Sequence, residues 1–471
     1  MGQTVPNDAD PEFAGFLLPP GPKSPKLLQG LCFGFFRRRT LLRLTRRHGG
    51  AYTINIPVYG RAVMIADPDL AKQVFFANTE ALGNSQPNLS RLLGPGSVFG
   101  LDGAEHRRRR TLLSPPFHGK SVRNYETVII EETLRETASW PEGQPIETVA
   151  SMMRITLNVI LRTIFGAEGV ALDQLRTVIP PFVSLGSKLG LFPMPSRTYG
   201  RFTPWGRLAQ LRAKYEIAVD HLIETALADP NLEGRTDVLS TLVRSRYDDG
   251  SPMTRRELSD ELLTLIAAGH ETTSATLAWT FERISRHPRL LADLQAEATS
   301  EETQLRRATI REVQRSRTVI DVIGRHVYAQ VFALGRWRLP YGTPVIIAIS
   351  QIHQDRAAFA NPDRFDPKRF IDGTFPAAWI PFGGGTRRCV GSAFADLEMD
   401  VTLRTVLRQF KIETTTAPDE KWHTRGVTFT PKSGGRVTVH RLVPAATTGA
   451  ISLESAGHPG TVVHTRGPVA E

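Results

Sequence analysis

Apolar residues recur at intervals of three and four along most of the chain from about Pro68 to Phe410. This spacing places them on one side of a helix, so it predicts amphipathic helices. The longest helices are predicted at 121–140, 146–165, 205–228, 255–286 and 390–408. The pattern therefore predicts a mainly α protein.

Shorter stretches have the β-branched and aromatic composition of strands. Residues Ala51–Ala66 contain two such runs around Tyr59-Gly60, which predicts a hairpin. Strand patterns return at 331–349 and 427–439. A smaller β portion is thus expected beside the large helical one.

The 471 residues suffice for one large enzyme domain or for two or three ordinary domains. The sequence contains no internal repeat and no abrupt change of composition that would mark a linker. We therefore expect a single large domain over residues 27–443. The proline-rich residues 1–26 are expected to form an extended lead-in, and residues 444–471, which lack periodicity, a disordered tail.

The composition is that of a globular protein in a reducing compartment. Hydrophobic residues make up 41% and charged residues 22%, which excludes long disorder. The two cysteines, Cys32 and Cys389, lie 357 positions apart, so a disulfide scaffold is excluded as well. The early apolar stretch Leu27–Phe36 is far shorter than the roughly 20 residues that span a bilayer. Because no secretory signal pattern is present, we expect a cytoplasmic protein without a transmembrane segment, and contact with a membrane surface stays open.

A net charge of +11 points to an acidic partner, a phosphate-rich surface or an internal anionic ligand. The basic runs Arg37–Arg39 and Arg107–Arg110 are not interleaved with aromatic residues, so nucleic acid is not expected as a partner. The chain also lacks the phosphate-binding loop, the dinucleotide fingerprint and the signatures of zinc proteases and serine hydrolases.

Residues 381–391, PFGGGTRRCVG, place a cysteine after three glycines and ahead of an amphipathic helix that is expected from about Val390. Glycines let the backbone pass close to a flat ligand. The positive end of the helix, together with Arg387 and Arg388, favours a thiolate at Cys389. The alternative is a buried cysteine that only fills space in a turn.

Residues 262–273, LLTLIAAGHETT, change from apolar to small and polar in the middle of a long predicted helix. The Thr272 hydroxyl is expected to donate a hydrogen bond to the carbonyl of Ala268, four residues back. The alternative is a solvent-exposed Glu271-Thr272 pair on a bent helix.

The cysteine segment resembles that of the cytochrome P-450 superfamily of haem-thiolate monooxygenases. It matches the pattern F-x-x-G-x-R-x-C-x-G at all five fixed positions, Phe382, Gly385, Arg387, Cys389 and Gly391. The resemblance implies the cytochrome P-450 fold and a haem b cofactor, with Cys389 as the axial ligand of its iron. It also implies that Phe382 lies against the thiolate loop and that Arg387 reaches a haem propionate.

Residues 268–272 match the family signature [AG]-G-x-[DE]-T. The resemblance assigns Thr272 to stabilising activated oxygen and Glu271 to supplying protons, and it places Ala268 over the haem face. Family members that use hydrogen peroxide typically lack this acid-alcohol pair. Its presence therefore favours dioxygen as co-substrate and electrons from a reductase.

Further basic residues are implied to bind the haem propionates. His106 and Arg110 lie four residues apart on one helical face, and the family commonly has Trp or His followed by Arg at this spacing. Arg325 is placed to meet a propionate by its distance along the chain from Arg315, with a surface arginine as the alternative. The neighbouring Arg107–Arg109 are expected on the side nearest the thiolate, where an acidic ferredoxin would dock.

Two segments resemble the scaffold of the family. Glu312 and Arg315 form an E-x-x-R step, and residues 362–370 match P-x-x-F-x-P-x-R-F. By resemblance, Arg369 closes a buried ionic network with Glu312 and Arg315. Residues 317–325 lack the prolines that often follow E-x-x-R, which leaves their path open.

The resemblance implies a monooxygenase that inserts one atom of dioxygen into a hydrophobic small molecule such as a lipid, steroid, terpene or polyketide. Two electrons would come from a ferredoxin and a ferredoxin reductase as separate chains. The alternatives are a peroxide-driven peroxygenase and a haem-binding sensor or carrier without turnover. The substrate pocket is expected between segments 83–100, 180–204, 262–276, 318–325 and 426–430.

Overall fold

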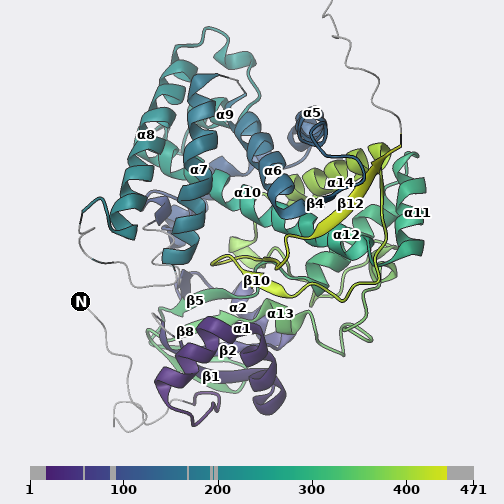
Figure 1. Cartoon of the computed structure of the whole chain (residues 1–471). Coiled ribbons are helices and arrows are strands. Elements are labelled where there is room, and N and C mark those ends of the chain that lie inside the picture. The colour runs from purple at the N-terminus through teal and green to yellow at the C-terminus, as the bar shows by residue number, and fades with distance from the viewer. Residues whose placement is uncertain are drawn as a thin grey trace, which may run out of the picture.

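The computed structural model describes residues 17–56, 59–84, 92–166, 169–190, 195 and 200–442. Figure 1 shows a helical body, built from α5 to α12 and α14, above a smaller part in which α1 lies over β1, β2 and β8. The prediction of a mainly α fold with a smaller β portion is confirmed. The tail predicted at 444–471 and residues 1–16 of the lead-in lie outside the described residues.

The helices account for the apolar periodicity of the chain. Their bounds are α1 Lys26–His48, α2 Pro68–Phe76, α4 Gly103–Leu113, α5 Glu126–Thr137, α6 Thr148–Phe165, α7 Val170–Leu189, α8 Pro204–Ala228, α9 Val238–Arg244, α10 Arg255–Ile284, α11 Pro288–Ala298, α12 Gln304–Ser316, α13 Ile349–Ile352 and α14 Ser392–Gln409. All five predicted long helices are confirmed, although the 3₁₀ turn Ser121–Tyr125 precedes α5.

In the described part of the chain, the strands form four sheets. The largest has the order β1-β2-β8-β5-β3, with β1 Ala51–Ile56, β2 Gly60–Ile65, β8 Pro344–Ile347, β5 Ile323–Val327 and β3 Leu82–Asn84. The others are β4 Pro145–Glu147, β12 Arg436–Arg441 and β9 Phe410–Ile412; β6 Val331–Leu334 with β7 Trp337–Pro340; and β10 Trp422–Thr424 with β11 Phe429–Pro431. The predicted hairpin is confirmed, because β1 and β2 pair antiparallel from Ala51↔Ile65 to Ile56↔Gly60.

The helix α10 runs through the centre of the protein. Its first turn is fixed by a capping box in which Thr254 and Glu257 satisfy each other's backbone N–H groups. Most of its side chains are buried, and it packs against α6, α12, α14 and β11. A Cβ atom on Gly269 would lie 3.3 Å from Cδ1 of Ile160 in α6, so glycine at this position permits the close approach of the two helices.

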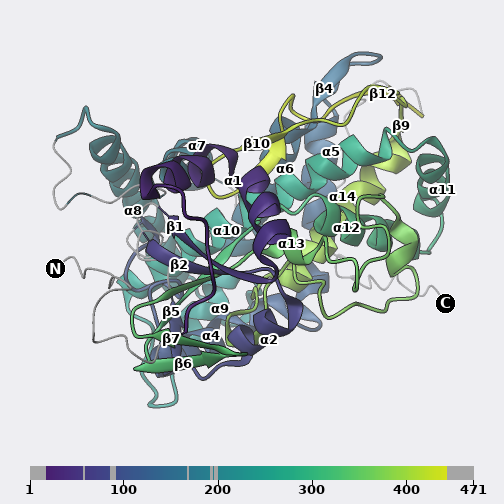
Figure 2. The ribbon, with the colours of Figure 1, turned by 90° about the horizontal axis from the view of Figure 1, so that it is seen from below.

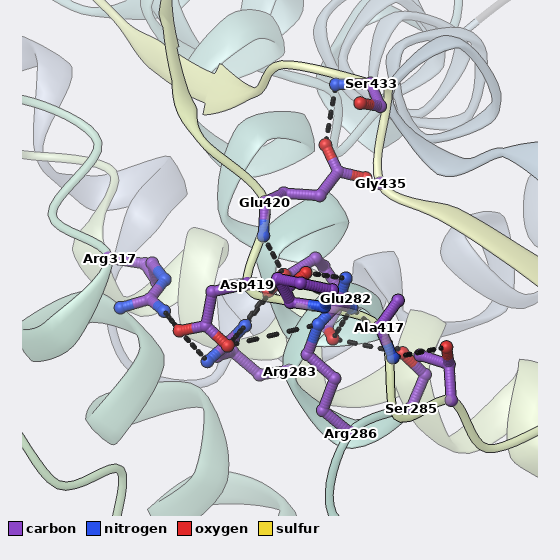
Figure 3. A network of polar contacts seen from close by, with 12 residues as sticks. Glu282, Arg283, Ser285, Arg286, Arg317, Ala417, Asp419, Glu420, Ser433 and Gly435 are labelled. Atoms are coloured by element: carbon purple, nitrogen blue, oxygen red, sulfur yellow. Dashed lines mark hydrogen bonds and ion pairs between the residues drawn. The ribbon is translucent and has the colours of Figure 1, made fainter.

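The C-terminal segment is tied to the end of α10 by a network of charges (Figure 3). Arg283 Nη1 donates to Asp419 Oδ2 at 2.9 Å, and Arg317 Nη2 donates to the same oxygen at 2.7 Å. The backbone N–H of Glu420 donates to Glu282 Oε1 at 3.0 Å. These contacts fix the loop that follows, including β10 and β11, beside α10.

Two helices were not among those that the sequence pattern located. Helix α1 at 26–48 precedes the predicted helical region, and α7 at 170–189 lies inside that region but was not among the long helices predicted there. Pro180 and Pro181 lie inside α7, where each removes a backbone donor. Tertiary contacts compensate for this loss, because Ile179, Phe182 and Val183 are buried in the main hydrophobic core.

Candidate active site

The cysteine loop is held against α2 by its glycines. Gly383 and Gly385 have φ of 67° and 65°, in the left-handed region that favours glycine. A Cβ atom on Gly385 would overlap the carbonyl oxygen of Phe75 in α2. The loop turns back on itself, and the N–H of Cys389 donates to the carbonyl of Phe382 at 3.0 Å. The carbonyl of Phe382 thus closes the loop that carries the cysteine.

A buried histidine that the sequence analysis did not single out holds the entrance to this loop. His353 Nε2 accepts a hydrogen bond from the backbone N–H of Ile380 at 3.0 Å, and His353 Nδ1 lies 3.0 Å from the Thr318 hydroxyl. Burial, with the nearby charge of Arg315, lowers the pKa of His353 to about 3. The ring is therefore neutral, and it carries its proton on Nδ1 because Nε2 is an acceptor.

Cys389 has an accessible side chain although protein atoms surround it closely. The side chain is exposed, yet burial raises the pKa of its thiol and outweighs the opposite effects of the Gly391 N–H, Arg110 and Arg388. We take the accessible surface to face the interior of the protein. The Gly391 N–H and Arg388 thus favour a thiolate, as predicted, but desolvation is the larger effect, so the net shift for the protein atoms alone favours the thiol. The helix also begins at Ser392, beyond Gly391, rather than at Val390.

Four basic side chains gather beside the loop. His106 and Arg110 lie on α4, Arg325 on β5, and Arg387 in the cysteine loop. His106 is buried, and its pKa is lowered to about 4 by burial and by the charges of Arg387 and Arg110. Burial, with the charge of Arg387, lowers the pKa of Arg325 to about 10. The charge of Arg387 thus disfavours a proton on both His106 and Arg325, as expected for basic groups gathered at one site.

Their hydrogen bonds leave capacity for an anion. His106 Nδ1 is buried and has no hydrogen-bond partner within the described residues. Arg110 donates to the carbonyl of Arg388, which joins α4 to the cysteine loop. Arg387 donates to the carbonyl of Leu101 at 2.6 Å and pairs with Asp102. Asp102 balances only part of the charge of this cluster.

These features fit a haem. The group is flat, carries two carboxylates and requires one axial ligand, for which a thiol, a cluster of four basic side chains and a glycine-rich loop are suitable partners. Ala268 is exposed although it lies in the middle of the largely buried α10. An exposed alanine within an interior helix provides a surface against which a flat ligand can lie.

The acid and the alcohol of α10 occupy different environments. The Thr272 hydroxyl donates to the carbonyl of Ala268 at 2.7 Å, which confirms the predicted bond. Glu271 is buried and its Oε2 accepts from the Ser187 hydroxyl of α7 at 3.2 Å. Burial raises the pKa of Glu271, and this effect is opposed by Arg425, Thr428 and Ser187. The predicted alternative of a solvent-exposed pair is wrong for Glu271.

A cavity of about 340 Å³ opens beside Glu271. It is lined by residues of α6, α7, α10 and the β10–β11 loop: Met153, Arg154, Leu157, Asn158, Arg176, Pro180, Val183, Ser184, His270, Glu271 and Arg425. Of the predicted pocket segments, 180–204 and 262–276 contribute to it. The contribution of α6 was not predicted, and parts of 83–100 and 180–204 lie outside the described residues.

The sequence analysis missed Arg425 and Ser187 as partners of Glu271. Arg425 Nε lies 3.5 Å from Glu271 Oε1. The next residue, Gly426, has φ of 96°, and a Cβ atom there would overlap the carbonyl of Ser187. This glycine is the signal in the sequence that marks a close approach, but it does not name the element approached.

The arginines expected at a docking surface divide into two kinds. Arg109 is buried and pairs with Glu257 and, at 2.9 Å, with Glu261 in α10, so its predicted place on a docking surface is wrong. Arg108 pairs with Asp249. Arg107 is exposed and donates to the Thr79 hydroxyl at 2.9 Å.

The predicted scaffold network is present. Glu312 and Arg315 are fully buried and joined by two hydrogen bonds of 2.7 Å. Arg369 Nε lies 3.6 Å from Glu312 Oε1. Arg315 also donates to the carbonyls of His353 and Pro362 at 2.9 and 2.8 Å, so it connects α12 with the segments leading to the cysteine loop. Beyond α12, residues 323–327 enter the large sheet as β5, which settles the path that the sequence left open.

Comparisons with known proteins agree over almost the whole chain. A family model described as cytochrome P-450 matches residues 19–436. Cytochrome P-450 138 of Mycobacterium tuberculosis (H37Rv) is 61% identical over 425 residues, which cover 90% of this chain and 96% of that protein. Cytochrome P-450 135B1 of the same organism is 36% identical over 453 residues, which cover 94% and 95%.

Two solved structures share the fold. Retinoic acid bound cyanobacterial CYP120A1 has a TM-score of 0.78 and 23% identity, and the match covers 91% of this chain and 100% of that one. The haem domain of cytochrome P-450DA has a TM-score of 0.79 and 21% identity, with coverage of 91% and 98%.

Proposed function

The chain belongs to the cytochrome P-450 family of haem-thiolate monooxygenases, and we propose that it inserts one atom of dioxygen into a hydrophobic small molecule. The observation that carries this proposal is the gathering of Cys389 and four basic side chains, from α4, β5 and the cysteine loop, at one site. The acid-alcohol pair of α10 completes the set of groups that the reaction requires.

Each part of a haem b has a matching group in this site. Cys389 would bind the iron, while His106, Arg110, Arg325 and Arg387 would bind the two propionates. Ala268 would lie against one face of the ring. Phe382, Gly385 and Gly391 would shape the loop on the other. When bound, the haem supplies an iron that binds and reduces dioxygen.

Proton supply falls to Glu271 and Thr272. Because burial raises the pKa of Glu271, its carboxyl holds a proton at a higher pH than an exposed glutamate. Ser187 and Arg425 orient that carboxyl at the wall of the cavity between α6, α7 and α10. The Thr272 hydroxyl is held by the Ala268 carbonyl, so it points toward the side of α10 that carries the exposed Ala268. We assign Glu271 to taking up protons and Thr272 to presenting them to the oxygen.

The substrate is proposed to be a lipid-like, steroid, terpene or polyketide-like molecule. Met153, Leu157, Pro180 and Val183 give the cavity beside α10 apolar walls, which support a hydrophobic ligand. The polar and charged residues of the lining, among them Asn158, Arg154 and Arg176, would fix the orientation of that ligand.

Electrons are proposed to come from a ferredoxin and its reductase as separate proteins. The exposed basic residues Arg107, Lys120, Arg123 and Arg388 lie on α4, on the turns that contact α14, and in the cysteine loop itself. Such a surface suits an acidic protein. Within the described residues, no group of three or more His, Cys, Asp or Glu side chains could hold a metal ion.

We propose a cytoplasmic location, where the free Cys32 stays reduced.

The first test is the difference spectrum of the dithionite-reduced protein with carbon monoxide, measured for wild type, Cys389→Ser and Cys32→Ser. Thiolate ligation shifts the Soret band strongly to the red, so we expect this band in wild type and Cys32→Ser and its loss in Cys389→Ser. A red-shifted band that survives in Cys389→Ser, or no haem in any form, would overturn the assignment.

Turnover then separates the monooxygenase from its alternatives. With ferredoxin, reductase and a substrate that shifts the spin state, a monooxygenase consumes reduced nicotinamide and forms oxygenated product. Product formation from hydrogen peroxide that is unchanged in Thr272→Ala would indicate a peroxygenase. A red-shifted band without any turnover would indicate a haem sensor or carrier.

A further inference from the structure

The first helix, α1, carries apolar residues on two opposite sides. Its inner side packs on the large sheet, where Phe33, Leu41 and Leu44 join a hydrophobic cluster with strand residues such as Ile54 and Met64. Its outer side exposes Leu27, Leu28, Leu31, Phe35 and Phe36, which we call the α1 outer face. Figures 1 and 2 show α1 at the periphery of the protein, over β1 and β2.

The exposure of this face is large for apolar side chains. Leu27 and Phe35 are each 77% exposed, and Leu31, halfway between them, is 47% exposed. The spacing of four residues aligns these three side chains along one stripe of the helix. Single exposed apolar residues are common on protein surfaces, but a contiguous exposed apolar stripe marks a surface that binds a partner.

The charged residues along α1 and its flanking segments all have one sign. Lys23, Lys26, Arg39, Arg43, Arg46 and Arg47 are exposed, and residues 17–66 contain no Asp or Glu. Within the described part of the chain, none of these six cations forms an ion pair. The apolar half of α1 joins the basic half at Phe36, where the backbone departs from helical geometry with φ of −129° and ψ of 33°.

We propose that the α1 outer face binds the surface of a membrane that contains anionic phospholipid. Leucine and phenylalanine side chains insert at the boundary between headgroups and acyl chains, while arginine and lysine bind the anionic headgroups. A helix that is apolar outward, basic at its flanks and free of acidic residues has the charge pattern for this surface. This membrane binding does not depend on the proposed monooxygenase reaction.

This binding is peripheral. Among the described residues, one helix, α6, has the length and apolar composition of a membrane span, and 72% of that stretch is buried inside the protein. Most of α6 thus packs in the protein core. The α1 outer face, by contrast, is anchored to the sheet by its inner side and needs no unfolding to reach a membrane.

The test is co-sedimentation of the full chain with vesicles of phosphatidylcholine alone and with vesicles in which about one-third of the lipid is phosphatidylglycerol. We expect at least about tenfold stronger binding to the anionic vesicles, weakened by salt. The double variants Leu31→Glu/Phe35→Glu and Arg43→Glu/Arg46→Glu should each weaken it by about tenfold or more.

The matched control is Ile217→Glu on α8, because Ile217 is 70% exposed and Figure 1 places α8 away from α1. Thermal unfolding followed by circular dichroism confirms that each variant is folded, whether or not haem is bound. The proposal is overturned by equal binding of wild type and Leu31→Glu/Phe35→Glu, or by the absence of binding. It is also overturned if wild type forms a dimer that Phe35→Glu abolishes, which would make this face an interface between copies.

Discussion

Arg425 Nε lies 3.5 Å from Oε1 of Glu271, a carboxylate that is otherwise buried between α7 and α10. The two residues are 154 positions apart, and Gly426 makes their approach possible by letting the β10–β11 loop contact Ser187. The positive charge of Arg425 opposes the effect of burial on the pKa of Glu271. Arg425 is therefore a positioning residue for the proposed proton donor.

Replacing Arg425 with Gln should shift the pH dependence of coupled turnover to higher pH. Without the cation, burial raises the pKa of Glu271 further, so the carboxyl stays protonated to a higher pH. The measurement is product formed per reduced nicotinamide consumed, across pH. Arg176→Gln is the control, because Arg176 lines the same cavity and pairs with Asp173 instead of Glu271. An unchanged profile, or an equal shift in the control, would contradict this role.

Thr272→Ala should leave the red-shifted carbon monoxide band intact and divert electrons to hydrogen peroxide. The hydroxyl presents a proton to oxygen, and positioned proton donors contribute about a hundredfold or more to such steps, so the product yield per electron should fall by at least about tenfold. Thr276→Ala, which removes a similar bond to the carbonyl of Thr272 one turn further on, serves as the control. An equal product yield per electron in Thr272→Ala and wild type would show that the Thr272 hydroxyl does not present a proton to oxygen.

Arg110→Leu should weaken haem retention. A charge-assisted hydrogen bond to a carboxylate contributes about 1.5–3 kcal/mol, so the dissociation constant should rise roughly ten- to hundredfold. Titration of haem into the apoprotein measures this change. Arg108→Leu on the same helix is the control, because Arg108 pairs with Asp249 on the surface. Similar affinities in the two variants would argue against a propionate contact at Arg110.

Glu312→Ala should lower the free energy of unfolding by about 3–5 kcal/mol, because it leaves the guanidinium of Arg315 buried without its partner. Glu147→Ala is the control, because Glu147 forms an exposed ion pair with Arg436. The Arg436 side chain is 62% exposed and the Glu147 side chain 52%, so this variant should lower the free energy of unfolding by at most about 1 kcal/mol. Denaturant unfolding monitored by circular dichroism compares the two. Equal losses would show that the Glu312–Arg315 pair does not contribute as a buried ion pair.

The local parts of the site follow from the sequence. Periodicity located α10 to within a few residues, and the spacing of His106 and Arg110 placed both on one side of α4. The bond from Thr272 to Ala268 was predictable because it joins residues one turn apart in a helix. The cysteine loop was recognisable because its glycines and arginine recur at fixed spacing in the family.

Contacts between distant segments were decided by the tertiary structure. Nothing near Arg425, Ser187 or His353 in the sequence indicates that the first two meet Glu271 and that the third holds Ile380. Arg109 was misplaced for the same reason: its partners, Glu257 and Glu261, lie on a helix about 150 residues away. Helix α7 forms through two prolines because its flanking side chains gain more from burial than the backbone loses.

The sequence thus determined which residues carry the chemistry and the local geometry of each, since hydrogen bonds within a helix or a turn depend on neighbours along the chain. The tertiary structure decided which of these residues are buried, which partners they meet and therefore in which direction their pKa values shift. Desolvation and ion pairing depend on everything that surrounds a group in space, and for Glu271 and Arg109 the interacting groups come from other segments of the chain. Cys389 combines Gly391 and Arg388 of its own loop with Arg110 of α4.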